Sequence, residues 1–319
     1  MIKLISDFWN VLKQSSSEWM KSSASKDSAS IAYYAIFSLP GLLIIVIWVA
    51  GNFFGEEAIR GEITAQFRGI MGKDVAGSIE SIITSAVIDR QNIWMKALGV
   101  GTLIYGATTL FFQMQTSLNQ LWDIESAPKR AWQKFLLDRA NSLGMILVIA
   151  FLLLISMVLS SLLGLANNLI THYFGIETYI LMQVSNFIMG FLVVTLLFAF
   201  MFKVLPDVEI SWKSVWMGAV VTALLFNIGK MLLSMYFDLS KPTSVFGAAG
   251  TVILIMMWVN YSCQIIFFGA EFTKVYAYMK GHSIKPSKFA KWNAEKRLRD
   301  QENSIIVPVE DDLANKTES

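Results

Sequence analysis

The chain has 319 residues, of which 55% are hydrophobic and only 16% are charged. Soluble domains usually carry about 25% charged residues, so this composition indicates a membrane protein. The net charge of +2 is too small to indicate a nucleic-acid-binding protein. The single cysteine, Cys263, lies in an apolar run and therefore excludes a disulfide framework or a cysteine-based metal site.

The first 30 residues do not form a typical signal peptide, because charged side chains interrupt them and no small-residue cleavage site follows an apolar core. Apolar side chains recur there at helical spacing instead. The pattern predicts that residues 1–30 form a cytoplasmic amphipathic helix lying on the membrane surface. Its apolar members are Leu4, Phe8, Val11, Leu12 and Trp19.

Six apolar segments follow, each long enough to cross a bilayer core about 30 Å thick as a helix. They predict an all-α, polytopic membrane domain over residues 31–278. The first segment contains Pro40 and Gly41 and should bend there, because proline removes a backbone N–H group. The predicted spans are about 31–51, 94–122, 142–166, 180–204, 215–237 and 246–272.

Lysine and arginine are distributed unevenly between the segments outside the spans. Nineteen lie in residues 1–30, 122–140 and 203–213 and from residue 271 onward, whereas five lie in the other connections. Connections rich in Lys and Arg are usually cytoplasmic, so the sequence predicts that both termini lie in the cytoplasm.

Two segments outside the spans have patterns of their own. In the first outer connection, apolar side chains at helical spacing over 59–71 and 75–86 predict two short amphipathic helices on the outer surface, with a plain connector as the alternative. The tail, residues 279–319, is basic near the membrane and acidic at its end. Its basic part predicts binding to anionic lipid headgroups, and its end predicts disorder.

Three stretches together carry a family signature. They are Asp27-Ser28-Ala29 running into Ala32-Tyr33-Tyr34-Ala35-Ile36-Phe37-Ser38-Leu39-Pro40, then Leu121-Trp122-Asp123, and then Phe246-Gly247-Ala248-Ala249-Gly250-Thr251 leading through Trp258 to Gly269-Ala270-Glu271-Phe272. Over about residues 20–280 the chain resembles the YihY/BrkB family of bacterial inner-membrane proteins. The resemblance implies six spans and an inner-membrane location. It implies no established activity, and the ribonuclease label that the family has carried is regarded as a misassignment. The chain departs from the family at Gly41, where a large apolar residue is usual.

Polar side chains form stripes on two of the predicted spans. Thr102, Tyr105, Thr109, Gln113, Thr116 and Gln120 fall within about 80° of arc on the second span, and Asn260, Gln264 and Glu271 fall within about 40° on the sixth. Both stripes reach the cytoplasmic half, so our hypothesis is that they face each other across a cavity open to the cytoplasm. The alternative is that these residues only join helices by hydrogen bonds. Further cavity candidates are Asn186, Asn227 and Lys230.

Two ionisable residues stand out within these spans. Lys230 lies inside the fifth span, where a lysine costs at least about 2.5 kcal/mol, so it is a functional candidate. Its alternative role is to extend its amine to the membrane surface along its apolar stem. Glu271 lies near the predicted cytoplasmic boundary beside Lys274, and a surface ion pair is the simpler interpretation.

Small residues form a further group of candidates. Gly247, Gly250 and Thr251 give the sixth span a small face that allows close helix packing, with a gate as the alternative. Pro40 and Gly41 belong to the same group of packing or gate candidates.

The available side chains argue against an enzyme. His172 and His282 are predicted on opposite sides of the membrane, and the sequence contains no metal-binding or nucleotide-binding motif. We therefore predict no catalytic residues, metal, cofactor or nucleic-acid partner. The sequence favours a transporter or permease that moves an amphipathic or anionic, lipid-related or envelope-related substrate. The alternative is a membrane scaffold that transports nothing.

Overall fold

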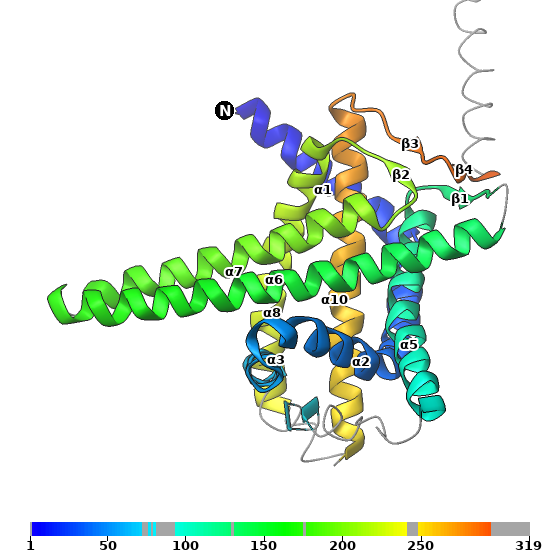
Figure 1. Cartoon of the computed structure of the whole chain (residues 1–319). Helices are drawn as coiled ribbons and strands as arrows, with labels where there is room; N and C mark the ends of the chain where they lie inside the picture. Colours follow the sequence, from blue (N-terminus) through cyan, green and yellow to red (C-terminus); the bar gives the residue numbers. More distant parts are fainter. Residues whose placement is uncertain are drawn as a thin grey trace, which may run out of the picture.

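The computed structural model describes residues 2–71, 76–77, 79–80, 93–128, 131–174, 177–240 and 248–294. Long helices dominate this part of the chain, and two small two-stranded sheets lie at one end of it (Figure 1). In chain order the elements are α1 (Ile2–Lys21), α2 (Ala24–Phe54), α3 (Glu56–Met71), α5 (Ile93–Leu121), β1 (Ile124–Ser126), α6 (Ala131–Phe174), α7 (Glu177–Val204), β2 (Val208–Glu209), α8 (Trp212–Ser240), α10 (Ala248–Met279), β3 (Lys285–Pro286) and β4 (Ala290–Trp292).

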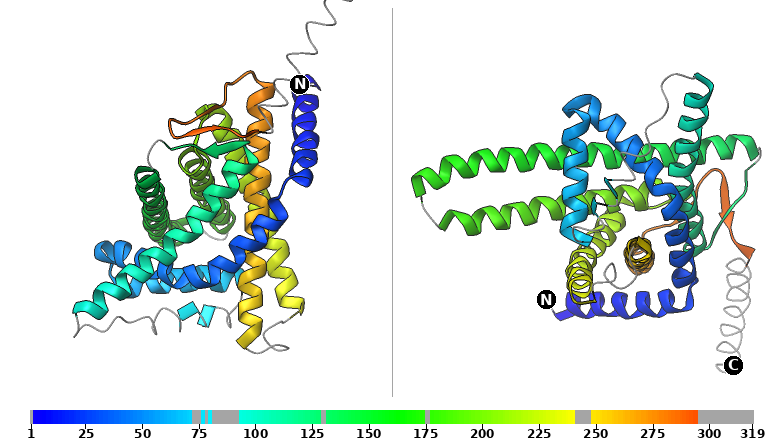
Figure 2. Two further views of the ribbon diagram at one scale, coloured as in Figure 1. Left: turned by 90° about the vertical axis from the view of Figure 1, so that its right-hand side faces the viewer. Right: turned by 90° about the horizontal axis from the view of Figure 1, so that it is seen from below.

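The helices form a body and an arm. α2, α5, α8 and α10 make up the body, with α10 near its centre (Figures 1 and 2). α6 and α7 form an antiparallel pair that runs crosswise to α10 and extends well beyond the body; α6 packs on α2 and α5, and α7 packs on α8. α6 has 44 residues and is therefore about 66 Å long, roughly twice the thickness of a bilayer core. The arm and the body therefore do not share one helix direction.

Five of the described helices are long and apolar enough to cross a membrane, namely α2, α6, α7, α8 and α10. They confirm an all-α membrane protein. α5 matches the second predicted span in position and has 29 residues, but it is not among the five. The number of helices that cross the bilayer therefore stays a prediction.

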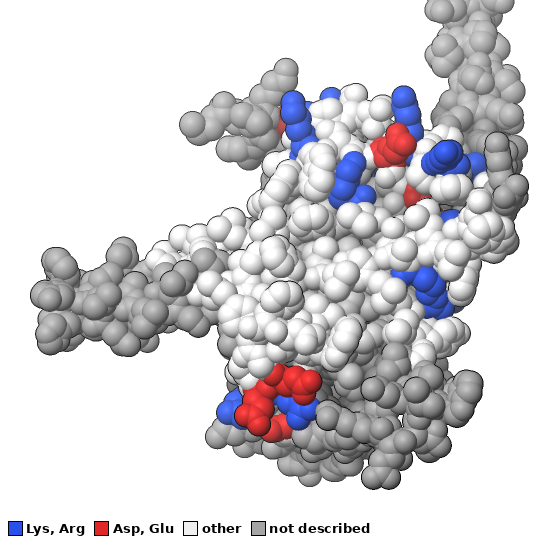
Figure 3. Space-filling model, in the orientation of Figure 1, with Lys and Arg blue, Asp and Glu red and all other residues white. Residues whose placement is uncertain are grey.

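The charged side chains mark the two ends of the body. On the face shown in Figure 3, Lys and Arg gather at the end that carries the strands, acidic side chains with a few basic ones gather toward the opposite end, and the surface between them carries few charges. α1 and the last described strand, β4, lie at the same end (Figure 1). This arrangement suits a protein embedded in a bilayer between its two charged ends.

The connections at the strand end form one small folded cap. β1 pairs with β4 in antiparallel register, with Ile124 opposite Trp292, and β2 pairs with β3, with Val208 opposite Pro286. The first described residues of the tail thus bind both the connection after α5 and the connection after α7. The sequence identifies the two connections only as segments rich in Lys and Arg. The tail is folded as far as β4.

The helix α1 docks on the body instead of standing alone. Its Val11 is buried against Val221 of α8 and Phe272 and Val275 of α10, and the rings of Phe8 and Phe272 lie 5.8 Å apart. A break at Ser22 and Ser23 separates it from α2, so the predicted segment 1–30 contains parts of two helices. Whether the outer face of α1 lies on a membrane stays a prediction.

The proline inside α2 and the junction between α2 and α3 follow from local sequence. Pro40 lies inside α2, which is bent along its length (Figure 2). α2 ends at Gly55, whose φ of 89° favours glycine, and α3 begins at once. Within α3, Ile59 and Ile63 are buried. The second helix predicted in the first outer connection falls mostly outside the described residues.

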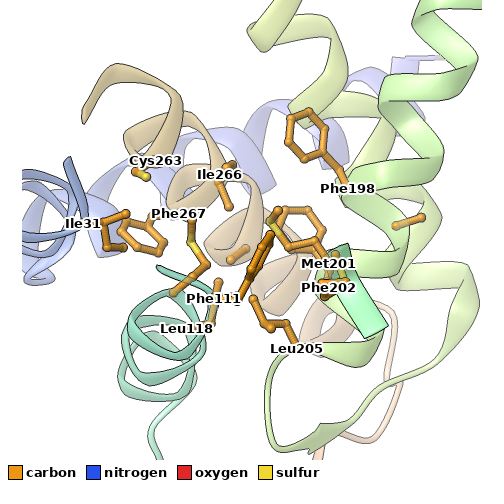
Figure 4. Close-up of a cluster of buried hydrophobic side chains, with 14 of the residues drawn as sticks. Ile31, Phe111, Leu118, Phe198, Met201, Phe202, Leu205, Cys263, Ile266 and Phe267 are labelled. Carbon is orange, nitrogen blue, oxygen red and sulfur yellow. The ribbon is translucent and has the colours of Figure 1, made fainter. Parts of the chain in front are cut away.

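The apolar core lies where α5, α7 and α10 meet. Phe111 and Leu118 of α5, Phe198 and Phe202 of α7, and Ile266 and Phe267 of α10 are buried together (Figure 4). Trp122, directly after α5, is also buried, and its Nε1 donates to the backbone oxygen of Ala270 at 3.2 Å. The core therefore holds the arm's strand-side half against the body.

α8 and α10 approach each other through two matched glycine–threonine contacts. A Cβ added at Gly218 would overlap the Thr273 hydroxyl, and one at Gly269 would overlap the Thr222 hydroxyl. Each threonine donates to the glycine oxygen four residues earlier on its own helix, at 2.6 Å for Thr222 and 2.7 Å for Thr273. Such small-residue contacts let helices pack closely in a membrane.

Candidate functional site

A buried ion cluster lies where α5, α6 and the turn after α7 meet. The Lys134 amine lies 2.5 Å from Oδ1 of Asp138 and 2.6 and 2.7 Å from the two carboxylate oxygens of Asp207. Lys134 and Asp138 stand one turn apart on α6, so they share a helix face. All three residues are buried, and Lys134 is only 4% exposed. We call Lys134, Asp138 and Asp207 the ion cluster.

Amide side chains of α5 hold the ion cluster in place. Asn119 donates from Nδ2 to Asp207 at 2.9 Å and accepts the backbone N–H of Asp207 at 2.8 Å. Gln115 donates from Nε2 to Asp138 at 3.0 Å, and its own Oε1 is buried without a hydrogen-bond partner among the described residues. A buried charge is tolerated when it is paired and hydrogen-bonded, and this one is both.

A second set of charges surrounds Glu271 on α10. Lys274 lies 3.0 Å from Asp123 and 3.8 Å from Oε2 of Glu271, and it donates to the backbone oxygen of Leu121 at 2.6 Å. Glu271 is only 2% exposed, and its Oε2 has no hydrogen-bond partner among the described residues. Glu271 lies beside Lys274 as expected, but its interpretation as a surface ion pair is wrong, because its side chain is buried.

The polar stripe predicted on α5 points away from the body. The buried apolar side chains Ala107, Phe111, Met114 and Leu118 lie roughly 170° around the helix from the stripe. Tyr105 is 65% exposed, Gln120 is exposed, and the other described members of the stripe, Thr109, Gln113 and Thr116, are half-buried. The side chain of Thr102 is not described. The hypothesis that the stripes of α5 and α10 face each other across a cavity is therefore wrong.

The stripe on α10 is partly internal. Asn260 and Gln264 are half-buried and bonded to each other, Gln264 Nε2 to Asn260 Oδ1 at 2.7 Å. This contact matches the alternative in which such residues satisfy one another. It does not test whether they also line a cavity.

Lys230 is half-buried on α8, and it makes no ion pair with any described residue. Asn227, one turn before it, donates to the backbone oxygen of Ala223 at 2.8 Å. The Tyr261 ring of α10 packs on Gly229, the neighbour of Lys230. The burial of Asn186 lies outside the description, so its place as a cavity candidate stays a prediction.

Arg139 is a cation on the outer side of α5 and α6. Its guanidinium carbon lies 4.9 Å from the ring centre of Tyr105, 5.4 Å from that of Phe135 and 5.9 Å from that of Phe112. It also donates to the Thr108 hydroxyl. No carboxylate of the described chain forms an ion pair with it. We call Arg139, Tyr105, Phe112 and Phe135 the aromatic cage.

The structure describes all but one of the small-residue candidates for packing or a gate. Gly250 and Thr251 are buried at the start of α10, while Gly247 lies outside the described residues. In α2, Gly41 is buried and Pro40 half-buried. Gly106 of α5 faces the α2 backbone at Phe37 and Ser38, so α5 packs close to the bend in α2. These positions fit packing and do not test a gate.

Sequence reasoning missed Gln115, Asn119, Asp138 and Asp207, and it counted Lys134 among the surface charges of a connection. The one available signal was the four-residue spacing of Lys134 and Asp138 on a segment with helical periodicity. Asp207 carried no signal, because only the turn after α7 brings it to Lys134. Among the described residues, no group of three His, Cys, Asp or Glu side chains could hold a metal ion.

Long apolar helices, two charged ends with few charges between them on the face in Figure 3, and buried ion pairs define a polytopic α-helical membrane protein. Residues 15–293 match the family model described as virulence factor BrkB, so the chain belongs to this family, also called YihY/BrkB.

Two curated relatives carry names that describe them as membrane proteins. A "UPF0761 membrane protein" of Pseudoalteromonas atlantica is 24% identical over 77% of this chain and 78% of its own length. One of Azotobacter vinelandii is 27% identical over 83% of this chain but only 62% of its own length. No solved structure matches the chain. The family membership confirms the resemblance, and the relatives' names carry no activity.

Proposed function

We propose that this chain is a multi-pass protein of the bacterial inner membrane that transports an amphipathic or anionic, lipid-related or envelope-related substrate. In this proposal all six apolar segments are embedded in the bilayer, with both termini in the cytoplasm. The chain acts without a catalytic centre, metal or cofactor. Its basic tail adds attraction to anionic headgroups.

The observation that carries the proposal is Lys230. Lys230 is a half-buried cation within a candidate span, and no carboxylate of the described residues lies in ion-pair distance of it. Such a cation costs free energy in a membrane, so its presence indicates a function. An anionic group passing along α8 would meet this charge in an apolar surrounding, where electrostatic attraction is strong. A lysine amine therefore favours an anionic substrate over a cationic one.

The test is lipid movement by purified protein in vesicles of phosphatidylethanolamine and phosphatidylglycerol that contain a fluorescently labelled anionic lipid. We expect the wild type to move the label between leaflets. Lys230→Ala should slow it at least about tenfold, which corresponds to about 1.4 kcal/mol of lost stabilisation. Lys213→Ala is the matched control, because it removes an exposed cation at the beginning of the same helix.

The alternative function is a membrane scaffold that transports nothing. The specific observation in its favour is the folded cap, where Lys285 and Lys288 are exposed and make no ion pair with any described residue. A scaffold should not move the labelled lipid in any form, and it should tolerate Lys230→Ala or lose only stability. A wild type that moves no label, or a Lys230→Ala variant as fast as Lys213→Ala, contradicts the transport proposal.

A further inference from the structure

We propose that the aromatic cage binds the phosphate group of an anionic membrane lipid. Arg139 projects from α6 toward α5, and the rings of Tyr105, Phe112 and Phe135 hold its planar guanidinium in one place. Arginine is suited to this role, because its flat fork of N–H groups binds two phosphate oxygens while its faces stack on aromatic rings.

The guanidinium has donors to spare. It carries five N–H groups, and the described hydrogen bond to Thr108 uses one of them. The adjacent carboxylate, Asp138, is already bonded to Lys134 and Gln115 inside the body. The charge of Arg139 is therefore not neutralised within the described chain, although it stands among apolar rings. A phosphate would neutralise the charge and accept the remaining hydrogen bonds.

The surface around Arg139 is suited to a lipid in particular. Trp132 is 59% exposed, and Phe135 and Leu136 on the same helix are exposed as well. In a bilayer such side chains contact acyl chains, while tryptophan and tyrosine favour the headgroup level. A ligand with a phosphate and fatty chains satisfies both the cation and this apolar surface, whereas free phosphate satisfies only the cation.

The proposal also accounts for the outward stripe on α5. The stripe includes Tyr105, which is one wall of the aromatic cage, and continues from there through Thr109 and Gln113. Gln113 makes no hydrogen bond to any described residue, so its amide is free to donate to the rest of a headgroup. A polar stripe facing lipid would otherwise be unfavourable.

The experiment measures lipid binding to the detergent-purified full chain by native mass spectrometry, with phosphatidylglycerol and phosphatidylcholine as probes. We expect phosphatidylglycerol to bind more tightly than phosphatidylcholine. Arg139→Gln should weaken phosphatidylglycerol about tenfold, as expected for the loss of one charge-assisted hydrogen bond. Lys213→Gln, the matched loss of an exposed charge on α8, should leave binding unchanged.

Two further variants distinguish the contribution of the aromatic cage from that of the positive charge alone. Arg139→Lys keeps the charge but loses the stacked fork, so its affinity should fall between those of the wild type and Arg139→Gln. Tyr105→Leu keeps an apolar side chain and removes one ring, and it should weaken binding about threefold. Tyr105→Leu also provides the test if Arg139→Gln does not fold.

The proposal is overturned if Arg139→Gln or Tyr105→Leu binds phosphatidylglycerol like the wild type. It is also overturned if inorganic phosphate at the same concentration competes fully with the lipid, because the acyl chains would then add nothing. The binding proposal and the transport proposal can be contradicted independently of each other. A wild type that binds phosphatidylglycerol through Arg139 but moves no labelled lipid retains this site and contradicts only the transport proposal.

Discussion

Two cations on α6, Lys134 and Arg139, stand five residues apart and have opposite environments. Lys134 turns inward and is held by two carboxylates and the amides of α5, whereas Arg139 turns outward and is held by three aromatic rings. Lys134 is charge-paired within the protein, and Arg139 is not paired within the described chain. The difference shows that the role of a charged residue is not decided by its position along a helix. It is decided by the side chains that other elements place around it.

The largest expected effect comes from removing the inward cation. Lys134→Met leaves Asp138 and Asp207 buried side by side without a counter-ion. We expect a loss of about 3–5 kcal/mol in the free energy of unfolding, measured by thermal or denaturant unfolding in detergent. The triple variant Lys134→Met/Asp138→Asn/Asp207→Asn removes all three charges and should recover part of that loss. Equal stability of Lys134→Met and wild type would show that the ion cluster is not structural.

A smaller effect is expected from removing one carboxylate. Asp207→Asn keeps the shape of the side chain and leaves Lys134 paired with Asp138 alone. We expect a destabilisation of about 1–2 kcal/mol, because the hydrogen bonds to Asp207 become neutral or are lost. The same unfolding assay measures it. A loss as large as that of Lys134→Met would mean that Asp138 alone cannot hold the lysine.

The smallest effect on stability is expected at the outward cation. Arg139→Gln removes its contacts with exposed rings, which contribute about 0.5–1 kcal/mol at such sites. The variant should therefore unfold close to the wild type while it loses lipid affinity. A destabilisation comparable to that of Lys134→Met would place Arg139 in the structural framework and remove the contrast between the two cations.

The sequence predicted the helical segments well, because each is a long apolar run whose length a bilayer dictates. It also carried the family signature. Periodicity correctly grouped the residues that share the α5 stripe, but it does not state which way a face points, so the stripe was placed toward α10 when it faces outward. Lys134 was assigned to a surface connection because nothing near it in sequence reveals Asp207, a neighbour only in space.

The direction of the arm had no signal in the sequence at all. A run such as 142–166 predicts a helix of spanning length, and α6 contains it, but the helix begins at Ala131 and runs crosswise to α10. Helix crossing depends on side-chain packing between elements far apart in the chain. The apolar pattern of one helix therefore cannot give it.

The cap has a consequence for how the protein is made. β3 and β4, from residues 285–292, are the last described elements of the chain, and they pair with β2 and β1. During synthesis β1 must wait with an unpaired edge while α6, α7, α8 and α10 are made, and β2 must wait while α8 and α10 are made. Closing the cap is thus a late step of biogenesis, and chains that end before Lys285 would leave the membrane insertion machinery with both strand edges still open.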